Sequence, residues 1–500
     1  MDKQTPENIN MEKLTTEMID KPASLHSPTS GVIHIRRRSA SFEDQVDAYV
    51  EDDNQSVDSV EEKPEEPKLK KHAYHFFSPE IAHLRRAYIK PLLMVITLIV
   101  ITQWGFIPLF FGSLWHNPTF TPNLRAFLID RDGSDLGSTM VSAFMENISG
   151  ANGVGKHHLG WRVINASTYA TNEEVAKAIV EEKAWLAVVV GEGATAKLIS
   201  ARQNGDASYD PQAAVTVYYN QARNEQAAGN YIVPLTTALL NQTLTLYSQR
   251  TTAAYFAQAA TNATAMNLLA VAPQTVVTPV SYTMINLRPY STPIAIAVTV
   301  VGQIFLIIFA FIVTMANFGL RAQIAPYLTM RSYLLLRCVV PIIAYIPVSF
   351  SYTMIDLPFH IPFASKYSYA GGYFVLWIYM WMGMTSLGLA TEAMITVLGL
   401  HFMPFFLLPL IISNVSVAMV PIDLQPWIYR YGYGFPIYNL GTTIRTIIFN
   451  THSQMGRNAG VVLAWIVLSC FTITTLTYWF ESRARAAAAK AEAESKPTSA

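Results

Sequence analysis

Six apolar segments set the pattern of this sequence. They lie at residues 91–115, 293–316, 338–355, 373–398, 403–420 and 459–480. A membrane interior about 30 Å thick is crossed by a helix of roughly 20 apolar residues, so each segment is predicted to be a transmembrane helix. The first segment begins too far from the N-terminus to be a signal peptide. The pattern therefore predicts six transmembrane helices, one isolated and five clustered.

A stretch of about 180 residues separates the first apolar segment from the second, and its pattern alternates between strand and helix. Strand-like apolar runs lie at 125–130, 161–165, 185–190 and 214–219, and helical spacing occurs at 137–148, from Thr171 onward and at 194–202. Thr171 and Glu174 have the spacing of a capping box. Strands that alternate with helices predict a mainly parallel sheet. Residues 227–270 are predicted to form long helices that return the chain to the bilayer.

The predicted fold class is an α-helical membrane protein with an α/β extracytoplasmic domain inserted between its first and second transmembrane helices. The expected parts are a disordered cytosolic tail (1–72), a juxtamembrane segment with the first helix (73–115), the α/β domain (116–292), a five-helix bundle (293–480) and a cytosolic C-terminal tail (481–500). The N-terminal tail is expected to be disordered because it is too polar to bury a core.

Two serines in that tail are candidate phosphorylation sites. Arginines stand three residues before Ser39 and Ser41, which is the pattern that basophilic kinases favour. A strongly acidic stretch follows at 43–66. The tail is either a regulatory arm controlled by phosphorylation or a solvated segment used in trafficking.

Charged residues make up 14% of the chain, whereas soluble domains usually contain about 25%. Positive charge beside the spans is retained in the cytosol. The flanking positive residues are Lys68, Lys70, Lys71, Arg85, Arg86, Lys90, Arg321, Arg331, Arg337, Arg483, Arg485 and Lys490. All fall on one side of a six-span topology, so both termini are predicted to be cytosolic and the α/β domain external or lumenal. Arg430, Arg445 and Arg457 lie on the opposite side and disagree with this orientation.

Glycosylation sequons support the same orientation, because they are modified only in the secretory lumen. The long loop contains four candidate sites, at Asn147, Asn165, Asn241 and Asn262. Asn54 also lies in a sequon but is expected to stay unmodified in the cytosol. Cys338 and Cys470 lie in predicted spans, so the α/β domain is expected to have no disulfide.

The segment SGANGVGKHH at 149–158 resembles a phosphate-binding loop, with Gly150, Gly155 and Lys156 at the required spacing. His157 replaces the hydroxyl that would bind magnesium, and a helix rather than a strand precedes the loop. A glycine-rich turn is therefore the better interpretation. The adjacent histidines His157 and His158 lack the further ligands of a zinc site. DRDGSD at 130–135 lacks the closing glutamate of a calcium loop and is predicted to be a turn.

Glu392 is the leading intramembrane candidate, because a carboxylate inside a bilayer costs roughly 2.5 to 3.5 kcal/mol unless it is protonated or paired. It either binds a cationic substrate or carries a proton, or it pairs with an arginine such as Arg337. The uncharged polar candidates Gln103, Asn414 and Ser413 more often join helices by hydrogen bonds. Prolines at 341, 347, 404 and 409 interrupt two of the spans, as in many transporters.

Three segments carry a resemblance to a known family: NLRAFLIDRDGSDLG at 123–137, EEVAKAIVEEKAWLAVVV at 173–190 and QPWIYRYGYGFPIYNLGTTIRTIIFNT at 425–451. Together with the one-plus-five arrangement of spans, the chain from about residue 75 to 480 resembles the fungal nitrosoguanidine-resistance protein family. That family is distantly similar to ABC-2-type permeases and bacterial phage-infection proteins. The resemblance implies a fungal multi-pass membrane protein linked to resistance against toxic compounds, through export or through changed membrane properties. It also implies that the aromatic segment at 427–438 dips into the outer leaflet as a re-entrant helix pair.

Two function classes follow. The first is a plasma-membrane export permease for toxic small organic compounds, expected to be a homodimer like ABC-2 permeases and to use a separate ATPase that docks on the turn at 317–333. The second is a non-transporting membrane protein that organises lipids or partner proteins. The endoplasmic reticulum or another endomembrane is the alternative location. No catalytic constellation is recognised, so an enzyme, a cofactor, a metal and a nucleic-acid partner are not expected.

Overall fold

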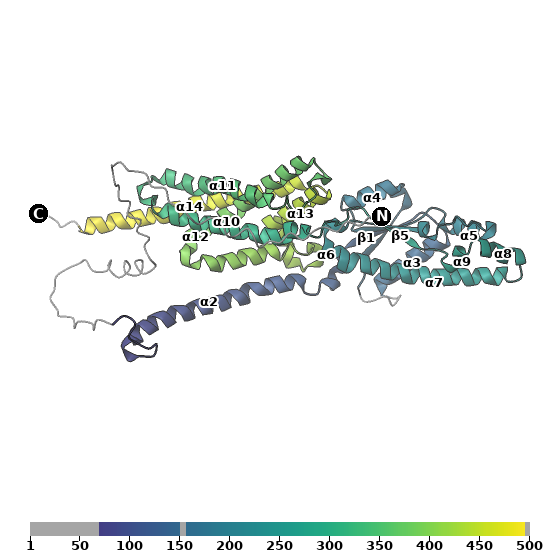
Figure 1. Ribbon diagram of the computed structural model, residues 1–500, viewed down its shortest axis with the longest axis horizontal. Helices are drawn as coiled ribbons and strands as arrows, with labels where there is room; N and C mark the ends of the chain where they lie inside the picture. Colours follow the sequence, from purple (N-terminus) through teal and green to yellow (C-terminus); the bar gives the residue numbers. More distant parts are fainter. Residues whose placement is uncertain (1–69, 151–156, 496–500) are drawn as a thin grey trace, which may run out of the picture. The chain divides into compact units, whose positions relative to one another are not determined.

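The computed structural model describes residues 70–150 and 157–495 (Figure 1). The predictions for Ser39, Ser41, Asn54, Gly155 and Lys156, and for most of the N-terminal tail, lie outside these residues. The chain divides into two compact units, 1–82 and 83–500. The first unit includes a short 3-10 helix, η1 (Pro79–Ile81). Everything described below belongs to the second unit, apart from the first residue of α2.

Five helices in the described residues are long and apolar enough to cross a membrane. They are α2 (Ala82–Leu114), α10 (Gly302–Ala322) with the preceding η7 (Ala297–Val301), α11 (Met330–Met354), α12 (Tyr369–Val415) and α14 (Met455–Ser495). The predicted first, second, third and sixth spans lie in or largely in α2, α10 with η7, α11 and α14. The predicted fourth span and most of the predicted fifth lie in the single element α12. This part of the chain is therefore a multi-pass helical bundle, as predicted.

Helix α12 contains a sharp break that explains why one element covers two predicted spans. Gly399 adopts φ +69° and ψ 171°, a backbone conformation that only glycine reaches easily. On one side of the break, Tyr379 donates a hydrogen bond to the carbonyl of Met455 at 2.9 Å. On the other side, the carbonyl of Ser413 accepts from Tyr431 at 2.9 Å. Both halves thus lead back to the segment between residues 431 and 455, so the chain reverses direction at Gly399.

Close packing between the bundle helices centres on Tyr345 of α11, which is completely buried. Its hydroxyl donates to the carbonyl of Ala310 at 3.0 Å and lies 3.0 Å from the hydroxyl of Thr314, both on α10. It also approaches α12 so closely that a Cβ added at Gly388 would lie 2.0 Å from it. Small residues at such contacts let membrane helices approach each other. Three helices therefore meet at one tyrosine.

In the sequence, a five-stranded sheet lies between α2 and α10. The sheet and the helices that pack on it are here called the sheet domain. The strands are β1 (Arg125–Asp130), β2 (Gly160–Ile164), β3 (Leu186–Val190), β4 (Val215–Tyr219) and β5 (Tyr282–Asn286), in the order β2-β1-β3-β4-β5. All neighbours pair in parallel except β3 and β4, which are antiparallel. The four predicted strands and the mainly parallel sheet are confirmed. The fifth strand was not predicted, since YTMIN has no continuous apolar run.

Alternate side chains of the strands point to opposite faces, and each face is covered by helices (Figure 1). Helices α3 (Asp135–Ser149), α5 (Ala194–Asn204) and α7 (Val233–Ala259) pack on the face that presents Leu128 and Val188. Helix α4 (Asn172–Val180) packs on the face that presents Ile129 and Val189. Its predicted capping box between Thr171 and Glu174 is present.

The long helices predicted at 227–270 exist, but the expectation that they return the chain to the bilayer is wrong. Helix α7 buries Leu239, Leu240 and Leu244 in the same core as the sheet. Helices α8 (Ala263–Val271) and α9 (Gln274–Val277) follow, and the chain then adds β5 to the sheet before it enters the bundle. The leucine spacing reports burial against the sheet, and burial against a sheet and against a membrane leave the same helical pattern.

The carboxyl ends of β1 and β3, where ligands bind in many α/β sheets, are closed by the chain itself. The Asp130 carboxylate accepts from the amides of Asp132 and Gly133 at 2.9 and 3.0 Å, which forms the predicted turn. The Asp132 carboxylate accepts from the amide and the hydroxyl of Thr195 at 2.9 and 2.6 Å. Asp132 thus occupies the start of α5, where an anionic ligand would otherwise bind.

Candidate functional site

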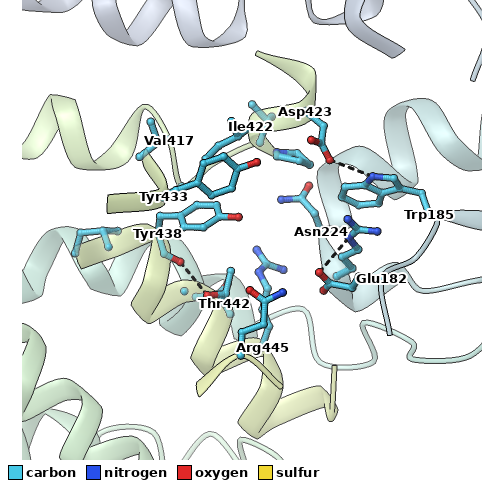
Figure 2. A pocket seen from close by; sticks show the side chains of 18 of the residues that line it. Glu182, Trp185, Asn224, Val417, Ile422, Asp423, Tyr433, Tyr438, Thr442 and Arg445 are labelled. Atoms are coloured by element: carbon cyan, nitrogen blue, oxygen red, sulfur yellow. Dashed lines mark hydrogen bonds and ion pairs between the residues drawn. The ribbon is translucent and has the colours of Figure 1, made fainter. Parts of the chain in front are cut away.

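A cavity of about 250 Å³, here called the junction pocket, lies where the sheet domain meets the bundle (Figure 2). The sheet domain contributes Arg125, Glu182, Trp185, Arg223 and Asn224. The bundle side contributes residues 417–423 except Met419, together with Tyr433, Ile437, Tyr438, Thr442, Arg445 and Arg457, among others. The pocket therefore combines charged groups, aromatic rings and an apolar wall.

Trp185 and Arg223 form the sheet-domain wall. Trp185 immediately precedes β3, and its indole N–H donates to the carboxylate of Asp423 at 3.3 Å. The guanidinium of Arg223, in η5 (Gln221–Arg223), stacks on the Trp185 ring at 3.5 Å. A guanidinium on an indole face is the most favourable cation–π arrangement. Arg223 also forms an ion pair with Glu182, with its Nε 3.8 Å from a carboxylate oxygen.

The bundle wall is built from two short helical segments, η11 (Trp427–Gly434) and α13 (Pro436–Phe449). Nearly every residue of α13 is buried, including Arg445, which is 5% exposed. Arg445 pairs with Glu225 and donates to the carbonyl of Ala222. One of its two terminal nitrogens, Nη2, is buried without a hydrogen-bond partner among the described residues. Tyr433 and Tyr438 pack edge to face with their ring centres 5.5 Å apart.

Positive charge exceeds negative charge in this pocket. Four of the lining residues are arginines, whereas Glu182 and Asp423 are the carboxylates that line it. Burial lowers the pKa of Arg223, and the nearby carboxylates of Glu182 and Asp423 oppose that shift. A lowered pKa means that the surroundings do not fully stabilise the charged guanidinium.

The arginines that disagreed with the predicted orientation are the ones that define this region. Arg445 and Arg457 line the junction pocket, and Arg430 lines the cavity beside it. Sequence reasoning treated them as an exception to a topology rule and did not predict a pocket. The signal was present, since three arginines interleaved with a run of aromatic residues are unusual in so apolar a region.

Glu392 lies in a second polar cluster, inside the bundle. One oxygen of its carboxylate lies 2.8 Å from a terminal nitrogen of Arg321 and 2.7 Å from Arg337. Arg337 also donates to the hydroxyls of Thr396 and Thr477, both at 2.6 Å. The three charged side chains are at most 3% exposed. This buried triad joins α10, α11 and α12, and the hydrogen bond from Arg337 to Thr477 adds α14.

The arrangement of the triad favours a structural role for Glu392. Both arginines converge on the same carboxylate oxygen, while the other oxygen, Oε2, is buried without a hydrogen-bond partner among the described residues. A carboxylate that two buried arginines contact serves as their shared counter-charge. The pairing with Arg337 is one of the two alternatives from the sequence, and Arg321 is a partner that was not predicted.

The remaining candidates lie apart from both clusters. Gln103 is exposed on α2. Asn414 is buried, donates to the carbonyl of Leu410 at 2.9 Å and accepts from the amide of Ile437 at 3.3 Å, so it joins α12 to α13. Ser413 donates to the carbonyl of Leu410 at 3.2 Å. The thiols of Cys338 and Cys470 are free.

The four sequons within the described residues differ in exposure. The candidate sites at Asn165, Asn241 and Asn262 are exposed, whereas the site at Asn147 is 4% exposed. His157 and His158 belong to no group of side chains that could hold a metal ion among the residues that the structure describes.

The fold and these sites define a multi-pass membrane protein with a sheet domain between its first span and the rest. Residues 94–471 match the family described as "Protein of unknown function (DUF3533)", and the chain belongs to that family. It is also similar to a protein of Saccharomyces cerevisiae named as an uncharacterized endoplasmic reticulum membrane protein. The two are 24% identical over 447 residues, which cover 83% of this chain and 86% of the yeast protein. No solved structure matches.

The triad makes an asymmetric prediction about stability. The substitution Glu392→Gln leaves two buried arginines without a counter-charge and is expected to destabilise the bundle by roughly 3 to 5 kcal/mol. Arg321→Gln leaves a balanced pair of Arg337 and Glu392, so its effect is expected to be smaller. Thermal unfolding of the purified full chain in detergent measures both. Arg331→Gln, at an exposed arginine of the same helix as Arg337, is the matched control. A Glu392→Gln protein as stable as this control would contradict the structural role.

Proposed function

We propose that this protein binds an amphiphilic membrane component in the junction pocket and thereby organises lipids at the membrane, as the second function class from the sequence expects. The observation that carries the proposal is the composition of the pocket. The pocket is lined by charged side chains from both the sheet domain and the bundle, and it also presents the aliphatic residues Val420, Ile422 and Ile437. A polar headgroup and the first part of an acyl chain have the same division into polar and apolar parts.

The surroundings of the pocket support a membrane ligand rather than a fully soluble one. Trp427 and Ile428 of η11 are 75% and 59% exposed. Exposed aromatic residues next to membrane helices favour the headgroup layer. A lipid would reach the pocket by moving within its own leaflet, without leaving the membrane.

The triad also favours binding over proton-driven transport. Glu392 is the leading intramembrane carboxylate, and two arginines hold it. The contacts with Arg321 and Arg337 give this carboxylate a structural role, and no other carboxylate was singled out in the predicted spans. Binding a lipid requires no energy source, whereas a transport cycle would require one from outside the chain.

The proposed function predicts that filling the pocket blocks lipid binding. Ala418, which is partly buried, lines the pocket, and Ala418→Trp is expected to reduce binding of a fluorescent phospholipid by about tenfold or more, since the indole takes up much of the cavity. Fluorescence polarisation with the purified full chain in detergent measures the affinity. Ala253→Trp, in a separate groove of the sheet domain, is the matched control. Equal affinities for both variants would count against the pocket.

We further propose that both termini face the cytosol and that the sheet domain faces the lumen or the exterior. The plasma membrane is the location expected from the sequence, while the name of the yeast relative supports the endoplasmic reticulum.

The exposed sites Asn165, Asn241 and Asn262 are expected to carry glycans, and the buried site Asn147 is not. Endoglycosidase treatment of Asn→Gln variants tests this. The proposed orientation would be wrong if the protein carried no glycans and a reporter that fluoresces only in the cytosol gave a signal when attached to the sheet domain.

Export of toxic small organic compounds is a second proposal, favoured by the turn between α10 and α11. Leu320, in the last turn of α10, and Tyr327, between the two helices, are 68% and 88% exposed, as expected for a docking surface used by a separate ATPase. Cells with Tyr327→Ala would then lose resistance, and Tyr478→Ala, at another exposed tyrosine, would keep it. Unchanged resistance in the Tyr327→Ala cells, and no efflux from vesicles that contain the purified chain and a proton gradient, would together rule out export by either energy source.

A further inference from the structure

A second cavity lies beside the junction pocket, and the two together are here called the arginine groove. The second cavity has a volume of about 600 Å³. Both cavities are lined by Arg125, Ile422, Asp423 and Tyr433, so they lie on either side of the same four residues. The second cavity adds Arg162 and Arg430 to the arginines of the first.

Positive charge is concentrated in this groove far beyond what its carboxylates balance. The six arginines that line it are Arg125, Arg162, Arg223, Arg430, Arg445 and Arg457. Glu182 and Asp423 are the carboxylates in the lining, and Glu225 neutralises Arg445 from just outside it. The surplus is three positive charges. Such a surplus attracts anions and raises their local concentration.

Several of these guanidinium groups are free to bind a ligand. Within the described residues, the side chains of Arg125, Arg162, Arg430 and Arg457 form no hydrogen bond or ion pair, and all four are exposed. Arg445 supplies an independent observation, because its Nη2 atom is buried, without a partner, in a side chain that lines the pocket. A buried N–H group without a partner is costly.

We propose that the arginine groove binds the phosphate of an anionic phospholipid headgroup, which names the ligand class of the proposed function and rests on it. Guanidinium groups present paired N–H donors that match two phosphate oxygens at once. The aromatic and apolar lining beside the arginines, including Trp427 and Tyr433, accommodates the glycerol and the start of the acyl chains. A free phosphate compound shares the phosphate but does not use this apolar lining.

The test compares two pairs of charge changes in the full chain reconstituted in nanodiscs. Arg430→Gln with Arg457→Gln removes two unpaired positive charges from the groove. Lys177→Gln with Lys197→Gln removes two exposed positive charges from helices of the sheet domain, away from the groove. Native mass spectrometry measures retained phosphatidic acid against phosphatidylcholine. The wild type and the lysine variant are expected to prefer phosphatidic acid, and the arginine variant is expected to lose about tenfold in affinity for it.

The outcomes separate this inference from the proposed function. Equal retention of the two lipids by the wild type, or equal loss in both double variants, would overturn the phosphate assignment and leave amphiphile binding intact. Retention of neither lipid would overturn both. Inorganic phosphate added as a competitor identifies the source: phosphatidic acid that resists millimolar phosphate supports a lipid headgroup, and phosphatidic acid that phosphate displaces supports phosphate recognition from water.

Discussion

The structure depends on one electrostatic constraint: a positive charge removed from water must be matched by a negative charge nearby. In the bundle, the single carboxylate of Glu392 contacts both Arg321 and Arg337, which leaves a net charge of +1, and no more than 3% of any of the three side chains is exposed. Such a cluster stabilises a fold less than apolar packing would, but loss of its single carboxylate would leave two charges uncompensated. The triad therefore fixes which helices are neighbours, since Arg321, Arg337, Glu392 and Thr477 come from four different helices.

The same constraint is met incompletely at the junction. Arg445 has Glu225 and Arg223 has Glu182, but the other arginines of the groove have no partner in the described residues. Several contacts also join the two parts of the protein there. Asn123 donates to the carbonyl of Asp423 at 3.0 Å, and Arg288 donates to the carbonyl of Asn450 at 2.8 Å. A ligand bound in the groove would contact both parts and complete the charge balance between them.

The sequence was sufficient for the features that depend on local periodicity. Long apolar runs marked the membrane helices, and short ones marked four of the five strands. Strand β5 was not predicted because its sequence, YTMIN, has no apolar run and its strand conformation depends on pairing with β4. The leucine spacing of α7 is the same for burial on a sheet and for burial in a membrane. The spans predicted at 373–398 and 403–420 already required a turn between them, and the structure places that turn at Gly399.

Long-range contacts account for what could not be predicted of the sites. Arg223 and Arg445 are separated by more than 200 residues and meet in one cavity. Glu392 was recognised because a lone carboxylate in an apolar run stands out, and one of its partners was named for the same reason. One indirect indication of the pocket was present in the sequence: Arg430, Arg445 and Arg457 disagreed with the predicted orientation. The orientation rule itself does not predict a binding site.

A structure of the full chain determined in nanodiscs that contain anionic phospholipid tests the central claim most directly. The account predicts a phosphate within hydrogen-bond distance of at least two of the exposed arginines of the groove, Arg125, Arg162, Arg430 and Arg457, with acyl density along its aliphatic and aromatic lining. An empty groove, or one in which a carboxylate of the same chain takes the place of the phosphate, would contradict it.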